Sequence, residues 1–423
     1  MASTSDNKTK MNKLQICLCI VGFLDFLGVA MLIPHLTKYM SSIGASPGVV
    51  GAVMSVYGFL QFFSGPMVGR FSDIFGHHRV LFWCILITGV SYGLMGITNS
   101  VTLIVLTRIP LGIFKQTQSL AKSQLADITP AHQRAEMFGR YNAISTAGFI
   151  IGPVLGGYIA EDSTRFGRVC FLTFLTFMVN LALVFFFVSS SPKEHVKRTA
   201  SIEKFTTDDY SINIKGFFSA FKKIAKTQPD LFAIRFLLGL CMMMFRSNFT
   251  LLLEQRFETT PKINGWIISY GSLISTLSGM MVGHVVRYYN NLSRLFKHSS
   301  IGMTITLILM TLSPSLLYFM MFSTCLSVFN SVSRVCAVDI GIQRGGVSDT
   351  GSLLGLTTSV MSISRTVAPL VSGVAMEYSV YCPSIIAIFL GSCGIALQIV
   401  YPLNRNLNVD DEQEYTNEKK KDK

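Results

Sequence analysis

Long apolar stretches alternate with short polar segments along almost the whole chain of 423 residues. Each apolar stretch holds about 20 residues, which is the length that an α-helix needs to cross a lipid bilayer. The pattern predicts an all-α membrane protein with twelve membrane-spanning helices, at 14–36, 48–68, 80–98, 101–121, 141–160, 169–189, 231–252, 264–283, 295–312, 316–338, 352–375 and 383–402.

One long polar interval, 191–228, separates six spans from six. We expect an N-terminal six-helix bundle over 1–190, a cytoplasmic linker over 191–228, and a C-terminal six-helix bundle with a tail over 229–423. Inside the linker, Phe217, Phe221 and Ile224 recur at helical spacing opposite several lysines. That spacing favours an amphipathic helix on the inner membrane surface. A partly disordered linker is the alternative interpretation.

The two halves share sequence features in register. Pro47 and Gly51 recur as Pro261 and Gly265, and the run Gly65–Gly69 recurs as Gly279–Gly283. Later in each half, Pro153, Gly157 and Glu161 correspond to Pro369, Gly373 and Glu377. Matches in register over half the chain predict two pseudo-symmetric bundles, and transporters built this way bind their solute between the repeats.

Composition and charge agree with a membrane location. Only 14% of the residues are charged, whereas soluble domains carry about a quarter, and half of the residues are hydrophobic. The net charge of +13 is unevenly placed, because one side of the predicted topology holds 25 Lys and Arg residues and the other holds 5. This bias predicts that both termini are cytoplasmic. The basic residues form no face of a soluble unit, which argues against nucleic-acid binding.

Several chemical classes lack their sequence signals. The nine cysteines are scattered and form no CxxC pair, so we expect no metal site or disulfide framework. The chain has no GxxxxGK[ST] phosphate loop and no GxSxG motif. We therefore expect neither an ATP-driven pump nor an enzyme, and no cofactor.

The polar segment after the second span carries a spaced motif of Gly69, Asp73, Gly76 and Arg79. Glycines permit a tight turn near a neighbouring helix, and a carboxylate can accept hydrogen bonds from a helix N-terminus or pair with an arginine. The motif resembles the loop 2–3 signature of the major facilitator superfamily, which implies an inner gate made by these four residues. It departs from the family at Ile74 and at the His77-His78 pair, where the family favours basic residues. A solvated loop is the alternative.

A glycine-rich run in the fifth predicted span resembles the superfamily's antiporter motif. Gly148, Gly152 and Gly156 fall on one helical face, so a neighbouring helix can pack closely there, with Pro153 and Gly157 completing the motif. Plain helix packing and coupled exchange are the two interpretations. The chain as a whole also resembles the superfamily's domain-containing protein 9 group and its tetracycline and drug–proton antiporter branch. The resemblance implies the twelve-helix major facilitator fold.

Seven charged residues lie within the predicted spans, apart from Lys297 at the start of the ninth span, which is counted with the preceding loop. A charge facing lipid costs at least about 2.5 kcal/mol, so these side chains should face water or partners. In the superfamily's fold, helices 1, 4, 7 and 10 line a central cavity, which implies that most of the charges do so. The candidate substrate or coupling residues are Asp25, Arg108, Lys115, Arg246, Arg334 and Arg365. Arg235 and Arg334 lie near helix ends, where snorkelling to the interface is the alternative.

The in-span charges are six positive against one negative, which favours an anionic substrate. Arg108 and Lys115 are two helical turns apart and should share a face. Asp25 is either a proton carrier or a fixed counter-ion to Arg108 or Lys115, and the nearby positive charges favour the counter-ion.

These patterns predict a secondary transporter of a small organic anion or amphiphile that works by alternating access, with protons as a candidate coupling ion. Its expected partners are a small-molecule substrate and the lipid bilayer, and we expect a monomer. A non-transporting membrane sensor on the same fold is the alternative, because fold alone does not fix function.

Overall fold

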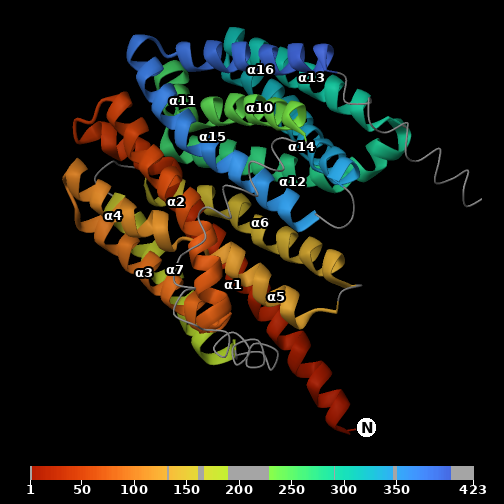
Figure 1. Ribbon diagram of the computed structural model, residues 1–423. Helices are drawn as coiled ribbons and strands as arrows, with labels where there is room; N and C mark the ends of the chain where they lie inside the picture. Colours follow the sequence, from red (N-terminus) through yellow and green to blue (C-terminus); the bar gives the residue numbers. More distant parts are fainter. Residues whose placement is uncertain are drawn as a thin grey trace, which may run out of the picture. The chain divides into compact units, whose positions relative to one another are not determined.

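A computed structural model describes residues 2–130, 133–160, 166–188, 228–289, 291–345 and 350–401. Every regular element in these residues is a helix (Figure 1). The first seven helices are α1 Ala2–Ser42, α2 Pro47–Phe75, α3 His77–Ile97, α4 Val101–Phe114, α5 Thr117–Ile128, α6 Arg134–Ile159 and α7 Phe166–Phe187. The remaining helices are α10 Pro229–Ser247, α11 Phe249–Phe257, α12 Pro261–Tyr289, α13 Leu292–Leu312, α14 Leu316–Gly345, α15 Thr350–Tyr378 and α16 Cys382–Val400.

The helices confirm the predicted membrane architecture. In the described residues, nine helices are long and apolar enough to cross a bilayer, and the bent pair α10 and α11 makes a tenth span. The pair α4 and α5 occupies the fourth predicted span, and the 29-residue helix α15 occupies the eleventh. The fold is therefore the expected one of twelve spans, and each predicted range overlaps its helix or helix pair.

Two spans are broken where the sequence pattern predicted continuous helices. α4 ends before Lys115, whose backbone leaves the helical region at ψ 62°, and α5 restarts at Thr117. Two side chains of α2 hydrogen-bond to the break. Gln61 Nε2 donates to the Lys115 carbonyl at 3.3 Å, and Ser64 Oγ accepts from Gln116 Nε2 at 3.0 Å. A break inside a membrane is tolerated only where protein groups satisfy the freed backbone in this way.

The second break lies between α10 and α11, which are bent by 48° at Asn248. A boundary between two compact units of the chain also falls at this bend. One compact unit comprises Met1–Ile212 with Asn248–Leu273, and the other comprises Asn213–Ser247 with Ile274–Lys423. α11 and the first part of α12 thus belong to the first unit, although the sequence pattern assigned them to the C-terminal bundle. The predicted linker helix around Phe217–Ile224, the rest of the linker from 191 to 227, and the tail from 402 lie outside the described residues.

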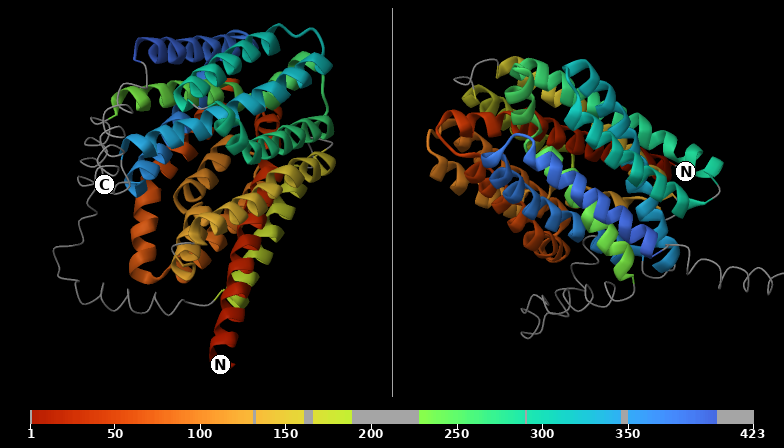
Figure 2. Two further views of the ribbon diagram at one scale, coloured as in Figure 1. Left: turned by 90° about the vertical axis from the view of Figure 1, so that its right-hand side faces the viewer. Right: turned by 90° about the horizontal axis from the view of Figure 1, so that it is seen from above.

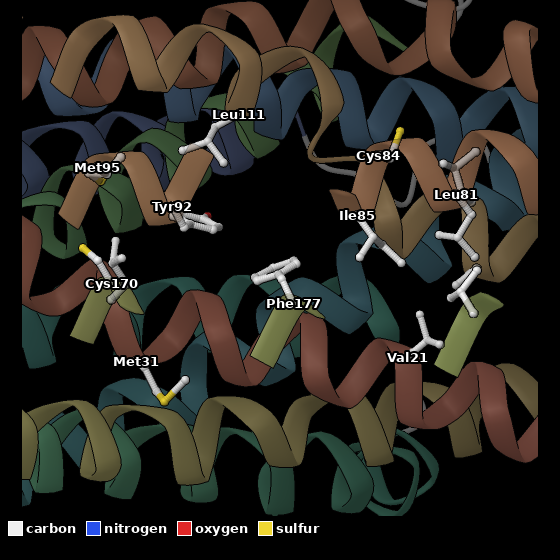
Figure 3. Close-up of a cluster of buried hydrophobic side chains, with 14 of the residues drawn as sticks. Val21, Met31, Leu81, Cys84, Ile85, Tyr92, Met95, Leu111, Cys170 and Phe177 are labelled. Carbon is white, nitrogen blue, oxygen red and sulfur yellow. The ribbon is translucent and has the colours of Figure 1, made fainter. Parts of the chain in front are cut away.

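The first unit is built around α1, which packs along α6 and α7 (Figure 2). Its core mixes aliphatic, aromatic and sulfur-containing side chains from α1, α3, α4 and α7. Figure 3 labels Val21, Met31, Leu81, Cys84, Ile85, Tyr92, Met95, Leu111, Cys170 and Phe177 among them. The two cysteines of this group, Cys84 and Cys170, are buried and free.

The internal repeat is visible in the helix boundaries. Pro47 and Pro261 each occupy the first position of a helix, and the two helices, α2 and α12, each contain 29 residues. Proline suits this position because its missing N–H would have no helical partner there. The repeated sequence therefore marks equivalent helix starts in the two halves.

Candidate functional site

A buried polar network lies at the break between α4 and α5. Lys115 Nζ forms an ion pair with Asp25 Oδ1, and the two residues are 8% and 0% exposed. Gln118 Nε2 donates to the other Asp25 oxygen at 3.1 Å and to the Gly22 carbonyl at 2.9 Å. Tyr141 O–H in turn donates to Gln118 Oε1 at 2.8 Å. Asp25 is thus the counter-ion of Lys115, and both of its oxygens have partners.

Arg108 lies apart from this ion pair. It is 1% exposed, its guanidinium lies 5.7 Å from the Tyr57 ring centroid, and Nη2 contacts Met54 Sδ at 3.7 Å. Its Nε has no hydrogen-bond partner within the described residues, and none of their carboxylates pairs with it. A cation over an aromatic face gains some electrostatic stabilisation when it is desolvated.

These contacts correct the expectation that Arg108 and Lys115 share one helical face toward a wet cavity. The helix ends between them, so the spacing of seven residues no longer sets their direction. Asp25, Arg108 and Lys115 are all buried within the first unit instead. Sequence reasoning also missed Gln118 and Tyr141, although the polar run from Gln116 to Ser119 inside a predicted span was an available signal.

The second unit contains a partly open cavity of about 170 Å³ that is rich in arginine and methionine. Four helices line it, through Arg235, Leu238, Gly239, Met242, Met243 and Arg246 of α10, Phe296 and Met303 of α13, Asn330, Ser333, Arg334 and Ala337 of α14, and Met361 and Arg365 of α15. On α10 the spacing of Arg235, Gly239, Met242 and Arg246 keeps them on one helical face. The described lining residues include no carboxylate.

The four arginines of this cavity fall into two kinds. Arg235 Nη1 donates to the Ala337 carbonyl at 3.0 Å, so this guanidinium is fastened to the cavity wall. Arg246, Arg334 and Arg365 have exposed side chains, and Arg246 lies within electrostatic range of the other two. In the described residues none of these three forms an ion pair. Snorkelling was the alternative for Arg235 and Arg334, but both line the cavity.

Sequence reasoning did not identify the neutral and apolar members of this lining. Asn330 and Ser333 add hydrogen-bonding groups on the same α14 face as Arg334. Met242, Met243, Met303 and Met361 form an apolar wall. The high methionine count, 20 residues, was the only available signal, and it does not say where the side chains gather.

The motif predicted as an inner gate begins within α2 and ends in a tight turn beside a buried histidine, His77. Gly76 has φ 95°, a conformation that favours glycine, and it joins α2 to α3. His77 Nε2 lies 3.2 Å from Asp127 Oδ2 and 3.8 Å from Asp73 Oδ1, and its Nδ1 lies 3.0 Å from Ser72 Oγ. The histidine thus links α3 to both α2 and α5.

The other motif residues, Gly69, Asp73 and Arg79, are partly or fully exposed to solvent. Asp73 has a side chain that is 68% exposed, and Arg79 is exposed and forms no ion pair with a described residue. A Cβ added at Gly69 would meet nothing within 4 Å, so this glycine does not serve a close helix approach. It lines a second cavity of about 240 Å³ with Gly65, Val68, Ser72, Asp73, Gln116, Ser119, Leu120 and Ser123. Pairing of Asp73 with an arginine in an inner gate stays a prediction.

The glycines of the antiporter-like motif pack against α1. A Cβ at Gly148, Gly152 or Gly156 would lie 2.2–2.7 Å from atoms of α1, mostly backbone atoms, so any side chain there would push the helices apart. Gly157 packs against α12 instead, because a Cβ added at this position would lie 2.7 Å from the Pro261 carbonyl oxygen. A Cβ at Gly265 would likewise lie 2.3 Å from the Pro153 carbonyl oxygen. Close packing of helices is thus the physical role that these glycines perform.

A polar cluster lies beside this glycine contact, at the ends of α1 and α11 and the start of α12. Lys38 Nζ lies 3.5 Å from Glu254 Oε1, and Asn264 Nδ2 donates to the same carboxylate oxygen at 2.9 Å. The Thr37 and Thr250 hydroxyl groups are 3.1 Å apart. We call Thr37, Lys38, Thr250, Glu254 and Asn264 the outer cluster, since the predicted topology places them on the outer side.

Comparison with known proteins places the chain in a family. Residues 18–369 match the Major Facilitator Superfamily. The quinolone resistance protein NorA of Staphylococcus aureus (strain MRSA252) is 23% identical over 400 residues, which covers 93% of this chain and 98% of NorA. Multidrug resistance protein 2 of Bacillus subtilis (strain 168) is 22% identical over 386 residues, covering 91% and 94%.

Solved structures agree on the fold. The human organic anion transporter MFSD10 (TETRAN) has a TM-score of 0.65 at 18% identity and covers 92% of this chain and 99% of its own. The nucleoside transporter NupG has a TM-score of 0.69 at 14% identity, covering 92% and 98%. Both are named as transporters, and the likeness to them supports the fold. The chain therefore belongs to the Major Facilitator Superfamily and is a multi-pass membrane transporter, not an enzyme.

Proposed function

We propose that this chain is a secondary transporter that moves a small organic anion or anionic amphiphile by alternating access. The observation that carries the proposal is the cavity of the second unit, where Arg246, Arg334 and Arg365 are exposed and have no described acidic partner. Arginines inside membrane helices are costly and usually mark a solute or ion pathway. Their guanidinium groups match the geometry of carboxylate and phosphate.

The names of relatives support the class of solute. One solved relative is named an organic anion transporter, and two bacterial relatives are named for quinolone and multidrug resistance. An amphiphilic anion fits the cavity, since its charged group would contact the arginines and its apolar part would contact Met242, Met303 and Met361. Ligand sites commonly combine an apolar wall with a few placed polar groups.

In this proposal the Asp25–Lys115 pair and the outer cluster, both in the first unit, have structural roles. The Asp25–Lys115 pair fixes the break in the fourth span, because each buried charge neutralises the other. The outer cluster joins α1 to α11 and α12 within the same unit. Exchange of a proton against the anion is the mode that the antiporter-like glycine motif supports, with protons as the candidate coupling ion.

The test is uptake of a radiolabelled organic anion into proteoliposomes that contain the purified full-length chain. The account predicts saturable uptake above that of protein-free liposomes, and a change of at least twofold in rate when a pH gradient is imposed. Saturable uptake that ignores the pH gradient would contradict proton coupling alone. No uptake of any anion, in protein that still binds one, would favour the sensor alternative.

A matched pair of variants assigns the flux to the cavity. Arg365→Gln removes a cavity charge, whereas Arg294→Gln removes an exposed charge at the start of α13 that does not line the cavity. We expect the first to lower uptake at least tenfold, since a hydrogen bond to a charged group contributes about 1.5–3 kcal/mol, and the second to leave it unchanged. Equal rates in the two variants would contradict the proposed site.

A further inference from the structure

The cavity of the second unit carries more positive charge than a monovalent anion can neutralise. Arg246, Arg334 and Arg365 all face it, while the fourth arginine, Arg235, is held by the Ala337 carbonyl. The described lining residues contribute no negative charge. Three like charges close together repel one another, most strongly where water is scarce. With all four lining guanidinium groups counted, a bound dianion would leave two net positive charges, whereas a monoanion would leave three.

Arg246, Arg334 and Arg365, which form no ion pair with a described residue, reach the cavity from three different helices, α10, α14 and α15. A ligand group that engages all three must therefore present acceptors in several directions from one compact centre. A phosphoryl group does so, because it has three terminal oxygens around one phosphorus atom. Arginine also forms paired, charge-assisted hydrogen bonds with phosphate. Two carboxylates on a carbon chain would spread their charge over a longer distance.

The rest of the lining indicates what is attached to the charged group. Met242, Met243, Met303 and Met361, together with Leu238 and Phe296, form an apolar wall. Methionine side chains are flexible and adapt to ligands of different shape. The cavity volume of about 170 Å³ is below the roughly 300–1,000 Å³ of sites for drug-sized ligands, so it fits a head group with a short chain.

We propose that this cavity binds the dianionic head group of a phosphate monoester that carries an apolar chain. The inference rests on the transport role proposed above and names the solute class of that site. Arg246, Arg334 and Arg365 each bind the phosphoryl oxygens, Asn330 and Ser333 supply neutral hydrogen-bonding groups, and the methionine wall contacts the chain. The same head group occurs in soluble alkyl phosphates and in phospholipids such as phosphatidic acid.

The experiment compares hexyl phosphate with hexyl sulfate by isothermal titration of the purified full-length chain in detergent, with protein-free micelles as the blank. The two esters share shape and chain, but the phosphoryl group loses a second proton near pH 6 and the sulfate does not. Arginine stays charged at both pH values used. We expect hexyl phosphate to bind at least tenfold more tightly at pH 8 and about equally at pH 5. Equal affinities at pH 8 would overturn the proposal.

Variants show whether the three arginines cause this preference. Arg246→Gln, Arg334→Gln and Arg365→Gln should each lower the phosphate-to-sulfate affinity ratio at pH 8 severalfold, while Arg294→Gln should leave it unchanged. Because the ratio compares two ligands on one protein sample, partial misfolding of a variant does not alter it. A ratio that stays at its original value in all three cavity variants would also overturn the proposal.

Two further titrations identify the source of the group. Inorganic phosphate should bind at least tenfold more weakly than hexyl phosphate, since it lacks the apolar chain, and equal binding would overturn the role of the methionine wall. In nanodiscs, replacing part of the phosphatidylcholine by phosphatidic acid should weaken hexyl phosphate binding if a lipid supplies the head group. An unchanged affinity in those nanodiscs supports a soluble ester as the source of the same group.

Measuring binding and uptake together distinguishes the proposed transport role from the proposed preference for a dianionic head group. Uptake of sulfate and phosphate esters at equal rates would keep the transport role and overturn the dianion preference. Tight, pH-dependent binding of hexyl phosphate with no uptake of any anion would keep the preference and overturn transport.

Discussion

Lys115 is paired with Asp25 at the point where the fourth span breaks, and the pair is buried inside the first unit. The break directs Lys115 toward α1, because a continuous helix would have carried its side chain along the face of Arg108. The ion pair and the helix break are therefore two parts of one arrangement.

Removing one partner of this pair should be strongly destabilising. Lys115→Met leaves the Asp25 carboxylate buried with Gln118 as its only described side-chain donor, and losing one partner of a buried ion pair costs about 3–5 kcal/mol. We expect a clear drop in the thermal unfolding temperature of the purified protein. The double variant Asp25→Asn with Lys115→Met should recover much of the loss, since no charge is left unpaired. Additive losses in the double variant would show that the two side chains do not stabilise each other.

Two glycines of α12 provide a matched test of close helix packing. Gly265→Ala places a methyl group 2.3 Å from the Pro153 carbonyl oxygen, whereas Gly271→Ala places one in open space. We expect the first variant to lose about 1–3 kcal/mol of stability through overpacking and the second to lose none. Thermal unfolding of both variants, followed by tryptophan fluorescence, measures the difference. Equal unfolding temperatures would mean that α6 and α12 are not in close contact at Gly265.

Gly76, the turn glycine of the inner motif, can be compared with Gly69, a glycine of the same motif that lies within α2. Gly76→Ala forces a side chain onto a backbone at φ 95° and ψ 136°, which costs about 1–3 kcal/mol. Gly69→Ala changes a helical residue with nothing within 4 Å, so it should be neutral or slightly stabilising. We expect lower unfolding temperature and expression for the first variant only. A harmless Gly76→Ala would indicate that the turn adopts another conformation.

The hydrophobic pattern predicted the spans because burial in lipid requires long apolar helices whatever their contacts. It could not predict the breaks at Lys115 and Asn248, since each depends on partners from elsewhere in the chain, such as Gln61 at the first break. The charge pattern located seven charges in the predicted spans and favoured Asp25 as a counter-ion, but it left Arg108 and Lys115 open as the partner. Spacing along one helix says nothing about the approach of Arg246, Arg334 and Arg365 from three different helices.

The measurement that tests the central claim most directly is the uptake selectivity of the arginine cavity. Proteoliposomes are given an anionic and a cationic amphiphile with the same apolar skeleton, and the ratio of their initial uptake rates is recorded. The account predicts a ratio well above one for the unmodified chain and for Arg294→Gln. For the triple variant Arg246→Gln, Arg334→Gln and Arg365→Gln, it predicts a ratio near one. A triple variant that keeps the original preference for the anion would contradict the account.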